Sequence, residues 1–467
     1  MNKIEKMLTA EQKRSILEIL LSTGGDFSEV FMEETTTDSL EMILGNVSKA
    51  TTQTIRGAAL RVIKDNVELN SSISDYSYEN LISAAKDLAS CFDGAPTTKV
   101  ESFKEIVLPK HVEVKKECAG DNKLELKLMH DITDGAKSVS DKIVQIQSVF
   151  WKKMQLMSVF ASDGTCTGDR RNNMRISCMV VAKDGDEMQT AFDSYGRNQG
   201  MEMFDAFDAY KMGKETAMNA VEMLSAIDMP GGDIPVVINN GFGGVILHEA
   251  CVHSLEATSV ARGMSVFCNK LNTKIASDIV NAVDEGVSSG EWGSINIDDE
   301  GTICQYRKLI ENGVLKTYLV DKRNAKIMNH PLTGSSRRES YKFQTTSRMT
   351  NTYFLPGNSK EEDIIKSVKY GLYCKKMGGG SVQPATGEFN FAVNVGYLIE
   401  DGQITKPVKG ATLVGSGKDV LMRIEMISDN LEHAQGMCGS LSGSIPTNVG
   451  QPTIKVSHMT VGGKGEN

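Results

Sequence analysis

Hydrophobic residues recur at helical spacing in four segments of the chain, each bounded by capping residues or glycine. In residues 9–21 the apolar positions follow the helical period, and Thr9 and Gln12 stand at the spacing of a capping box. Gly24 follows as a stop signal. The same pattern predicts three further helices, at residues 78–90, 123–138 and 214–226.

Alternation of apolar and polar residues predicts strands over much of the remaining chain. In the first half, strands are expected at residues 29–35, 39–44, 58–63, 144–150, 154–161, 176–181 and 188–192. Segments 144–150 and 154–161 are expected to pair with each other, and residues 183–186 predict a hairpin turn between the last two strands. In the second half, strands are expected at residues 234–238, 302–309, 314–320, 389–400, 404–414 and 453–461, with hairpin turns at 311–313 and 400–402. Helices mixed with antiparallel meanders predict an α+β fold rather than alternating βα units.

A cluster of proline and glycine at residues 228–232 is the strongest candidate for a domain boundary. We therefore expect an N-terminal α+β domain with antiparallel strands at residues 1–229. A β-rich C-terminal domain is expected at residues 230–467. The length of 467 residues fits two or three domains.

The charge balance disfavours nucleic acid as a partner. The chain has 51 Lys and Arg against 60 Asp and Glu, a net charge of −9, whereas nucleic-acid binders usually carry a basic excess or stripe. The first residues lack the apolar core of a signal peptide, and no run of about 18 apolar residues predicts a membrane helix. Nine cysteines without CxxC pairs fit reduced thiols, so we expect a cytoplasmic protein without membrane contact.

One segment, GGVILHEACVHSLE at residues 243–256, carries candidate chemistry. His248 followed by Glu249 on an apolar helix is typical of zinc peptidases, where imidazole binds the metal and the carboxylate takes a proton from water. His253 follows five residues after His248, one more than usual. Residues five apart on a regular α-helix lie about 140° apart around the axis. We therefore predict a π-type turn or a helix end between the two histidines.

The motif alone leaves the third ligand open. Catalytic zinc usually has three protein ligands and a water molecule. Cys251 lies inside the motif, and Cys438 lies in the small, flexible setting Gly-Met-Cys-Gly. The other candidates are His111, His130, His330, His433 and His458. At this stage metal binding has one alternative of about equal strength: His248 and His253 could be ordinary buried histidines.

Several long motifs in the same order resemble the TldD/PmbA family, often labelled modulators of DNA gyrase and understood as metalloproteases. Beside the His-Glu motif, the likeness is carried by INIDDEGT at 295–302, GSSRRESYKFQTTSRMTNTYFLPG at 334–357, KPVKGATLVGSG at 406–417 and VGQPTIKV at 449–456. The PmbA branch lacks the His-Glu motif, so the chain looks like a TldD-type subunit. The resemblance implies His248, His253 and Cys438 as ligands of one zinc ion per chain, with Glu249 as the general base.

The resemblance also implies a fold, a substrate class and an assembly. The β-rich C-terminal domain should carry the metal-site helix. Two chains, as a homodimer or as a heterodimer with a PmbA-like subunit, should enclose a cavity. The substrate should be an unfolded or extended peptide, in peptide maturation and turnover, which could bind by adding a strand to a sheet edge. The glycine run 378–380 could let a peptide backbone approach closely, and a flexible loop is an equally strong interpretation.

Two features of the family motifs call for interpretation. Val252 and Ser254 stand where the family usually has glycine, so a helix break there should form less easily. The cluster Arg337, Arg338, Glu339 and Tyr341 could hold a substrate carboxylate or orient a ligand. We favour a structural ion-pair network instead, because arginine clusters frequently serve packing and pairing.

Two other functions remain as alternatives. In the first, the chain is a non-hydrolytic peptide-binding or regulatory subunit with a structural metal. Such a site would have four protein ligands, and Cys251 would join the other three. In the second, the chain is a DNA-associated regulator, which the acidic charge balance disfavours.

Overall fold

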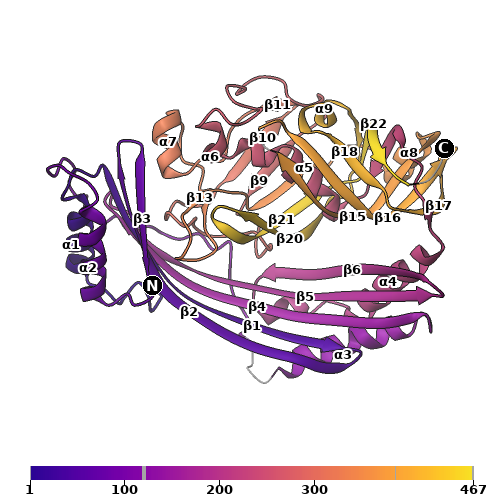
Figure 1. The fold of residues 1–467 in the computed structure, drawn as a ribbon, viewed down its shortest axis with the longest axis horizontal. Helices are drawn as coiled ribbons and strands as arrows, with labels where there is room; N and C mark the ends of the chain where they lie inside the picture. The colour runs from indigo at the N-terminus through magenta and orange to yellow at the C-terminus, as the bar shows by residue number, and fades with distance from the viewer. Residues whose placement is uncertain (1, 118–121, 384, 465–467) are drawn as a thin grey trace.

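The structure is a computed structural model that describes residues 2–117, 122–383 and 385–464. Its strands form sheets of six, six, two and eight strands, and its helices lie against them (Figure 1). This mixture confirms the predicted α+β content. Cys118, one of the nine cysteines, lies outside the described residues. No helix in the described ranges is long and apolar enough to cross a membrane.

The N-terminal half forms one long antiparallel sheet with the strand order β3-β2-β1-β4-β5-β6. The strands are β1 (Phe27–Ile43), β2 (Asn46–Lys64), β3 (Val67–Ile73), β4 (Ile143–Ala161), β5 (Cys166–Asp184) and β6 (Glu187–Asn198). The predictions of separate strands at 29–35 and 39–44, and of pairing between 144–150 and 154–161, are wrong. Each pair is one continuous strand, because the polar residues between its parts include no glycine or proline and pair with neighbouring strands.

Helices cover the two ends of this sheet. α1 (Ala10–Leu21) and α2 (Tyr78–Ala89) pack at one end, and α3 (Lys123–Lys137) and α4 (Ala209–Glu222) at the other (Figure 1). These helices confirm the four predicted ones. α4 begins earlier than the predicted residue 214, because the Asp208 side chain accepts a hydrogen bond from the Lys211 amide and caps the helix.

The other face of the sheet lies against the C-terminal half (Figure 1). Period-two alternation divides β1 between the two sides: Val30 and Met32 pack with α1 and α2, whereas Phe31 packs with Ile297 and Tyr341. Buried ion pairs also cross this contact. Burying a charge costs desolvation, which carboxylates and guanidinium groups with shared partners offset here in part.

The C-terminal half contains two large sheets. The six-stranded one has the order β11 (Val314–Leu315), β10 (Tyr306–Glu311), β9 (Ala282–Glu285), β14 (Asn351–Phe354), β21 (Gly443–Gln451) and β20 (Glu432–Ser440). The eight-stranded one has the order β15 (Tyr370–Gln383), β8 (Gly232–Ile238), β22 (Ile454–Gly462), β18 (Thr412–Ser416), β16 (Glu388–Glu400), β17 (Gln403–Lys409), β7 (Ile227–Asp228), with β19 (Ile424–Ile427) beside β22. β12 (Ser336–Arg337) and β13 (Thr346–Ser347) form a small pair.

Short helices connect these strands. They are α5 (Val245–Ala250), α6 (Ala257–Val260), α7 (Lys322–Met328), α8 (Glu361–Lys366), α9 (Gly417–Met422) and the 3-10 turns η3 (Gly241–Gly244) and η4 (Val252–Leu255). Two further 3-10 turns, η1 (Met201–Phe204) and η2 (Met223–Ser225), lie on either side of α4 in the N-terminal half. α5 lies in the core shared by both large sheets. The motif segment that contains α5 is therefore packed against both sheets.

Most strands predicted for this half are present, with three differences. The predicted strand 404–414 is two strands, because the chain turns at Gly410 with φ +72°. The strand expected at 314–320 is limited to β11, and the one expected at 302–309 is shifted to β10. The hairpin turns at 311–313 and 400–402 are confirmed, with Asn-Gly and Asp-Gly pairs at positive φ. The boundary at 229/230 stays a proposal; it follows β7, which pairs with β17.

Candidate metal centre

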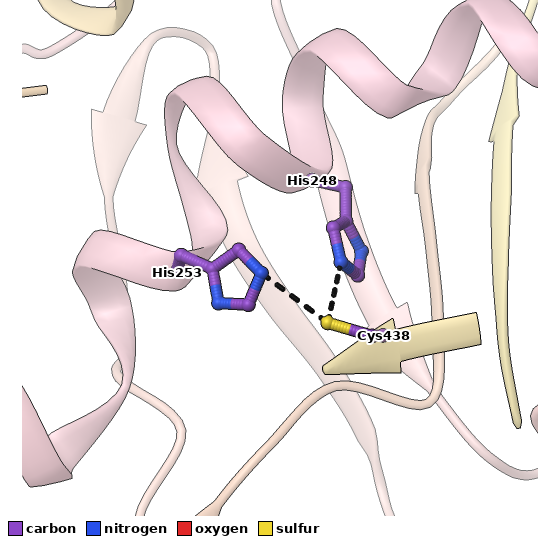
Figure 2. Close-up of side chains that lie close together, drawn as sticks. All are labelled: His248, His253 and Cys438. Carbon is purple, nitrogen blue, oxygen red and sulfur yellow. Dashed lines mark hydrogen bonds between the residues drawn. The ribbon is translucent and has the colours of Figure 1, made fainter. Parts of the chain in front are cut away.

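Three side chains far apart in the sequence converge on one point. The Nε2 atoms of His248 and His253 lie 3.1 and 3.3 Å from the Sγ atom of Cys438 (Figure 2). The two imidazole rings are 4.9 Å apart and nearly perpendicular, at 86°. One ligand atom from each side chain falls within 4.8 Å of the others. The predicted candidates His248, His253 and Cys438 are therefore brought together.

A helix end between the histidines makes this convergence possible. α5 stops at Ala250, Cys251 leaves the helical conformation with φ −125° and ψ −59°, and the chain resumes as the 3-10 turn η4. The prediction of a break between His248 and His253 is confirmed. Val252 and Ser254 have no positive φ. The break therefore requires no glycine at either position.

Close packing fixes α5, and with it His248. Val245, Ile246, Leu247 and Ala250 are all buried in the C-terminal core. At the start of the helix Gly244 lies directly on the backbone of β21, where a Cβ atom would come within 2.5 Å of Gly450. Only glycine allows this approach, so the helix can lie next to the sheet that carries the cysteine.

Cys438 approaches the histidines from β20, the edge strand of the six-stranded sheet. β20 pairs with β21, and Cys438 stands opposite Ile445 in that hairpin. Its side chain is buried, at 7% exposure. The thiol therefore meets the two imidazoles in a site mostly shielded from solvent.

The electrostatics of the group favour a thiolate beside a protonated imidazole. Burial raises the pKa of the Cys438 thiol, but the charges and hydrogen bonds of His248 and His253 outweigh burial and hold that pKa well below its ordinary value. Burial likewise lowers the pKa of His253, but Glu256 and Cys438 outweigh it and raise that pKa well above its ordinary value. The site thus stabilises the thiolate, the form of cysteine that binds a metal, and a metal ion there would replace the proton of His253.

The residues fit a zinc ion. Two imidazole nitrogens and one thiolate are typical zinc ligands, and bonds of about 2.0–2.3 Å in tetrahedral geometry place ligand atoms about 3.5 Å apart. The nitrogen-to-sulfur distances of 3.1 and 3.3 Å are within a few tenths of that spacing. Cys251 is not part of the group: it is fully buried in the core, and burial raises the pKa of its thiol to about 12. Among the described residues the group has three members.

Glu249 stands beside the group at the edge of a cleft. Its Oε2 atom lies 3.7 Å from His253 Nε2, and its side chain is 19% exposed. The cleft has a volume of about 550 Å³ and is lined by Phe242, Val245, His248, Glu249, His253, Glu256, Thr258, Ser259, Thr346, 379–382, 436–441, Thr447 and Val449. The carboxylate can therefore reach a water molecule or substrate that enters beside the three candidate ligands.

Sequence reasoning missed two residues that contact the group. Glu256 Oε1 lies 3.2 Å from Nδ1 of His253, and the Arg348 guanidinium donates to the Cys438 carbonyl at 2.6 Å. Glu256 follows His253 at a spacing of three, which could have drawn attention to it. Arg348 lies about 90 residues from either element, so nothing in its sequence context connects it with the histidines.

The arginine cluster of the longest motif does not line the cleft. Arg338 pairs with Glu29 at 3.1 Å, and the Tyr341 amide donates to Glu33. Arg337 donates to the backbone carbonyls of Met349 and Pro446. These buried contacts agree with the structural interpretation of the cluster.

Comparisons with known proteins give the family. Residues 231–463 match the PmbA/TldA metallopeptidase C-terminal domain, residues 117–224 the central domain, and residues 28–91 domain 1. The chain belongs to the PmbA/TldD metallopeptidase family.

Relatives within the family carry the TldD name. A metalloprotease TldD homologue of Haemophilus influenzae is 38% identical over 345 residues, which is 72% of each chain. A zinc metalloprotease TldD homologue of Saccharolobus solfataricus is 29% identical over 62% of this chain and 64% of that protein. The predicted family membership is thus confirmed.

Solved structures share the fold along nearly the whole chain. A protein of Thermotoga maritima described as a modulator of DNA gyrase superposes with a TM-score of 0.79 at 18% identity, covering 97% of this chain and all of that one. TldE from Thermococcus kodakarensis gives a TM-score of 0.74 at 17% identity, covering 97% and 99%. At these identities the likeness concerns the fold.

Proposed function

We propose that the chain is a zinc-dependent peptidase that hydrolyses unfolded or extended peptides. The observation that carries the proposal is the convergence of His248, His253 and Cys438, with Glu249 beside them, in an accessible cleft. Membership of a metallopeptidase family supports the reaction class. The donor set of two imidazoles and a thiolate, together with the relative named as a zinc enzyme, supports zinc as the metal, one per chain.

In this proposal Glu249 moves the proton. A bound zinc supplies a Lewis acid that polarises the scissile carbonyl and makes water more acidic. Glu249 Oε2 accepts the proton of the attacking water and later donates it to the leaving amine nitrogen. Its position at the mouth of the cleft, partly exposed, supports both transfers.

Two strand edges in the cleft that have no strand partner among the described residues support an extended substrate. β20 is the edge of its sheet, and residues 436–440 of it line the cleft. Across the cleft, residues 379–382 of β15 pair with β16 on one side, whereas the pairing of β15 with β8 ends at Cys374. A Cβ atom on Gly379 would meet nothing within 4 Å. A peptide backbone could therefore hydrogen-bond an edge strand with little dependence on its sequence.

Metal content and cleavage of an unfolded peptide, measured together, test the proposal. Wild type should hold about one zinc per chain. Cys438→Ser should lose zinc and cleavage together, and Glu249→Ala should keep zinc while cleavage falls by at least about 100-fold. Cleavage by Glu249→Ala at the wild-type rate would refute its role as the base. A metal-free wild type that still binds peptide would favour the non-hydrolytic function.

We also propose that the chain works in the cytoplasm as a dimer, with itself or with a PmbA-like subunit, and without nucleic acid. The fold shared with TldE supports a partner of the same family. The cysteines in the described ranges are all free, which supports a reducing compartment. Sedimentation of the chain alone and with a PmbA-like partner distinguishes the two dimers.

A further inference from the structure

A buried pair of charges lies behind the candidate ligands. Glu256 and Arg348 are 8% and 0% exposed at their side chains, and Arg348 Nε lies 3.6 Å from Glu256 Oε1. The same carboxylate oxygen is 3.2 Å from Nδ1 of His253. Arg348 Nη2 donates to the carbonyl oxygen of Cys438 at 2.6 Å. One pair of side chains therefore contacts two of the three candidate ligands, His253 and Cys438.

We propose that Glu256 and Arg348 are positioning residues that hold His253 and Cys438 in the geometry for metal binding. The inference rests on the proposed function, because it takes these two residues as ligands. The Glu256 carboxylate lies beside Nδ1 of His253 and favours a proton on that nitrogen, which leaves Nε2, the atom facing Cys438, for the metal. Arg348 balances the buried carboxylate and ties the cysteine-bearing strand to it.

The position of Cys438 explains why such a tie is needed. β20 is an edge strand whose sheet partner is β21, so Cys438 is carried by the outer arm of a hairpin. Arg348 Nη1 also donates to Ser442 Oγ at 2.8 Å and to the Gly443 carbonyl at 3.1 Å, both at the hairpin turn. The guanidinium thus fixes the hairpin end and the ligand strand together. A lysine has one ammonium group and cannot make all these contacts.

The two histidines differ in this respect. His248 Nδ1 is buried without a hydrogen-bond partner among the described residues, and His248 is held instead by the packing of α5. His253 lies beyond the helix end, on a short 3-10 turn. The Glu256 carboxylate therefore contacts His253, the candidate ligand that lies outside the α-helix.

Apart from its contacts with His253 and Arg348, the side chain of Glu256 makes no helix-capping bond that would obscure a test. Glu256 stands before α6, but its backbone carbonyl accepts the helix hydrogen bond and its side chain makes no capping bond. Arg337 provides the matched control for Arg348. It is equally buried, at 3% exposure, and donates to the backbone carbonyls of Met349 and Pro446 without contacting a candidate ligand.

The test is zinc affinity, measured by competition with a chelator, on the full chain. Glu256→Ala, Arg348→Met and Arg348→Lys should each bind zinc about 10- to 100-fold more weakly, the usual cost of losing a partner of a ligand. Glu256→Gln, which keeps an acceptor oxygen, should lose less than Glu256→Ala. Arg337→Met should unfold at lower denaturant concentration but bind zinc as wild type does. If Arg348→Met does not fold, the two Glu256 variants decide.

Failure of this inference differs from failure of the proposed function. Zinc affinity that stays at the wild-type value in Glu256→Ala and Arg348→Lys would overturn the positioning role and leave the peptidase proposal standing. An equal loss in Arg337→Met would also overturn it, because the effect would then follow from stability alone. Weaker zinc binding in the Glu256 variants, with cleavage still intact in Glu249→Ala, would support positioning and refute the catalytic assignment.

Discussion

His253 stands five positions after His248, and this spacing determined how much of the site could be predicted from the sequence. The motif identifies both imidazoles, and helix geometry then requires a break between them, which the structure places at Cys251. No comparable rule singles out Cys438, 185 residues after His253, and only the family resemblance pointed to it. Contacts such as that of Arg348 depend on the folded chain, so residue patterns could not predict them.

Val252 shows why the break does not need the glycine that the family resemblance led us to expect at this position. Its side chain is fully buried in the C-terminal core, and its backbone has no positive φ. We predict that Val252→Gly lowers the free energy of unfolding by about 2–4 kcal/mol, through lost burial and added chain entropy. Chemical denaturation measures this change, and zinc content should stay the same. A gain in stability would mean that the backbone at this position is strained.

At the scale of elements, caps and turns were predicted well and strand lengths poorly. The capping box of α1 depends on two residues three apart, so the sequence displays it directly. The extent of β1 and β4 depends on neighbours far along the chain, which supply hydrogen bonds across polar stretches such as Thr36 to Asp38. The alternation of apolar and polar residues stops at such polar stretches. The prediction therefore divided single strands into two.

The capping box of α1 gives a prediction with a matched control. The Thr9 side chain accepts a hydrogen bond from the Gln12 amide, whereas Ser77, which precedes α2, makes no side-chain capping bond. Thr9→Ala should therefore lower the free energy of unfolding by about 1 kcal/mol, and Ser77→Ala by clearly less. Urea denaturation of both variants decides; equal losses would contradict the assigned caps.

Asp321, which caps α7, should make stability depend on pH. Burial, followed by the nearby charge of Glu300, raises the pKa of Asp321 from 3.8 to about 6. Because the folded pKa is the higher one, ionisation opposes folding, and stability from this group falls as pH rises from about 4 to 6. The full span is about 3 kcal/mol, of which roughly 1 kcal/mol falls between pH 5 and pH 7.

The variant Asp321→Asn isolates this effect. An amide keeps an oxygen that can accept the Asn324 amide hydrogen bond, but it cannot ionise. Relative to wild type, the variant should therefore gain about 1 kcal/mol in free energy of unfolding on going from pH 5 to pH 7. Chemical denaturation at the two pH values measures the difference. A gain in the opposite direction would contradict the sign of the pKa shift.

At the scale of the whole molecule, buried charges join the N-terminal sheet to the C-terminal half. Arg61 lies 3.0 Å from Glu29 and 2.6 Å from Glu300, and Arg338 lies 3.1 Å from the other oxygen of Glu29. Arg171 pairs with Asp299 at 2.7 Å. In the sequence, nothing distinguishes these residues from other charged residues. Their role could not be predicted, because the partners lie far apart in the sequence and several of the pairs join the two halves of the chain.

The two tryptophans report on this contact. Trp151 of β4 and Trp292 of the C-terminal half lie with ring centroids 5.8 Å apart, and the Trp292 indole donates to the Gly436 carbonyl on the cysteine-bearing strand. They are the two tryptophans of the chain, so intrinsic fluorescence follows the docking of the two halves. Gly436 lies two residues before Cys438, so the hydrogen bond from Trp292 links docking of the two halves to the candidate metal centre.

We predict that Arg338→Met weakens this docking by about 3–5 kcal/mol, because it leaves the buried Glu29 carboxylate with one cationic partner instead of two. The fluorescence transition should then move to lower denaturant and precede the loss of helical circular dichroism. Lys104→Met, which removes an ion pair exposed at 64% and 58%, should leave both signals close to those of wild type. If both variants behaved alike, the buried charges would not hold the halves together, and the packing around Phe31 would have to do so alone.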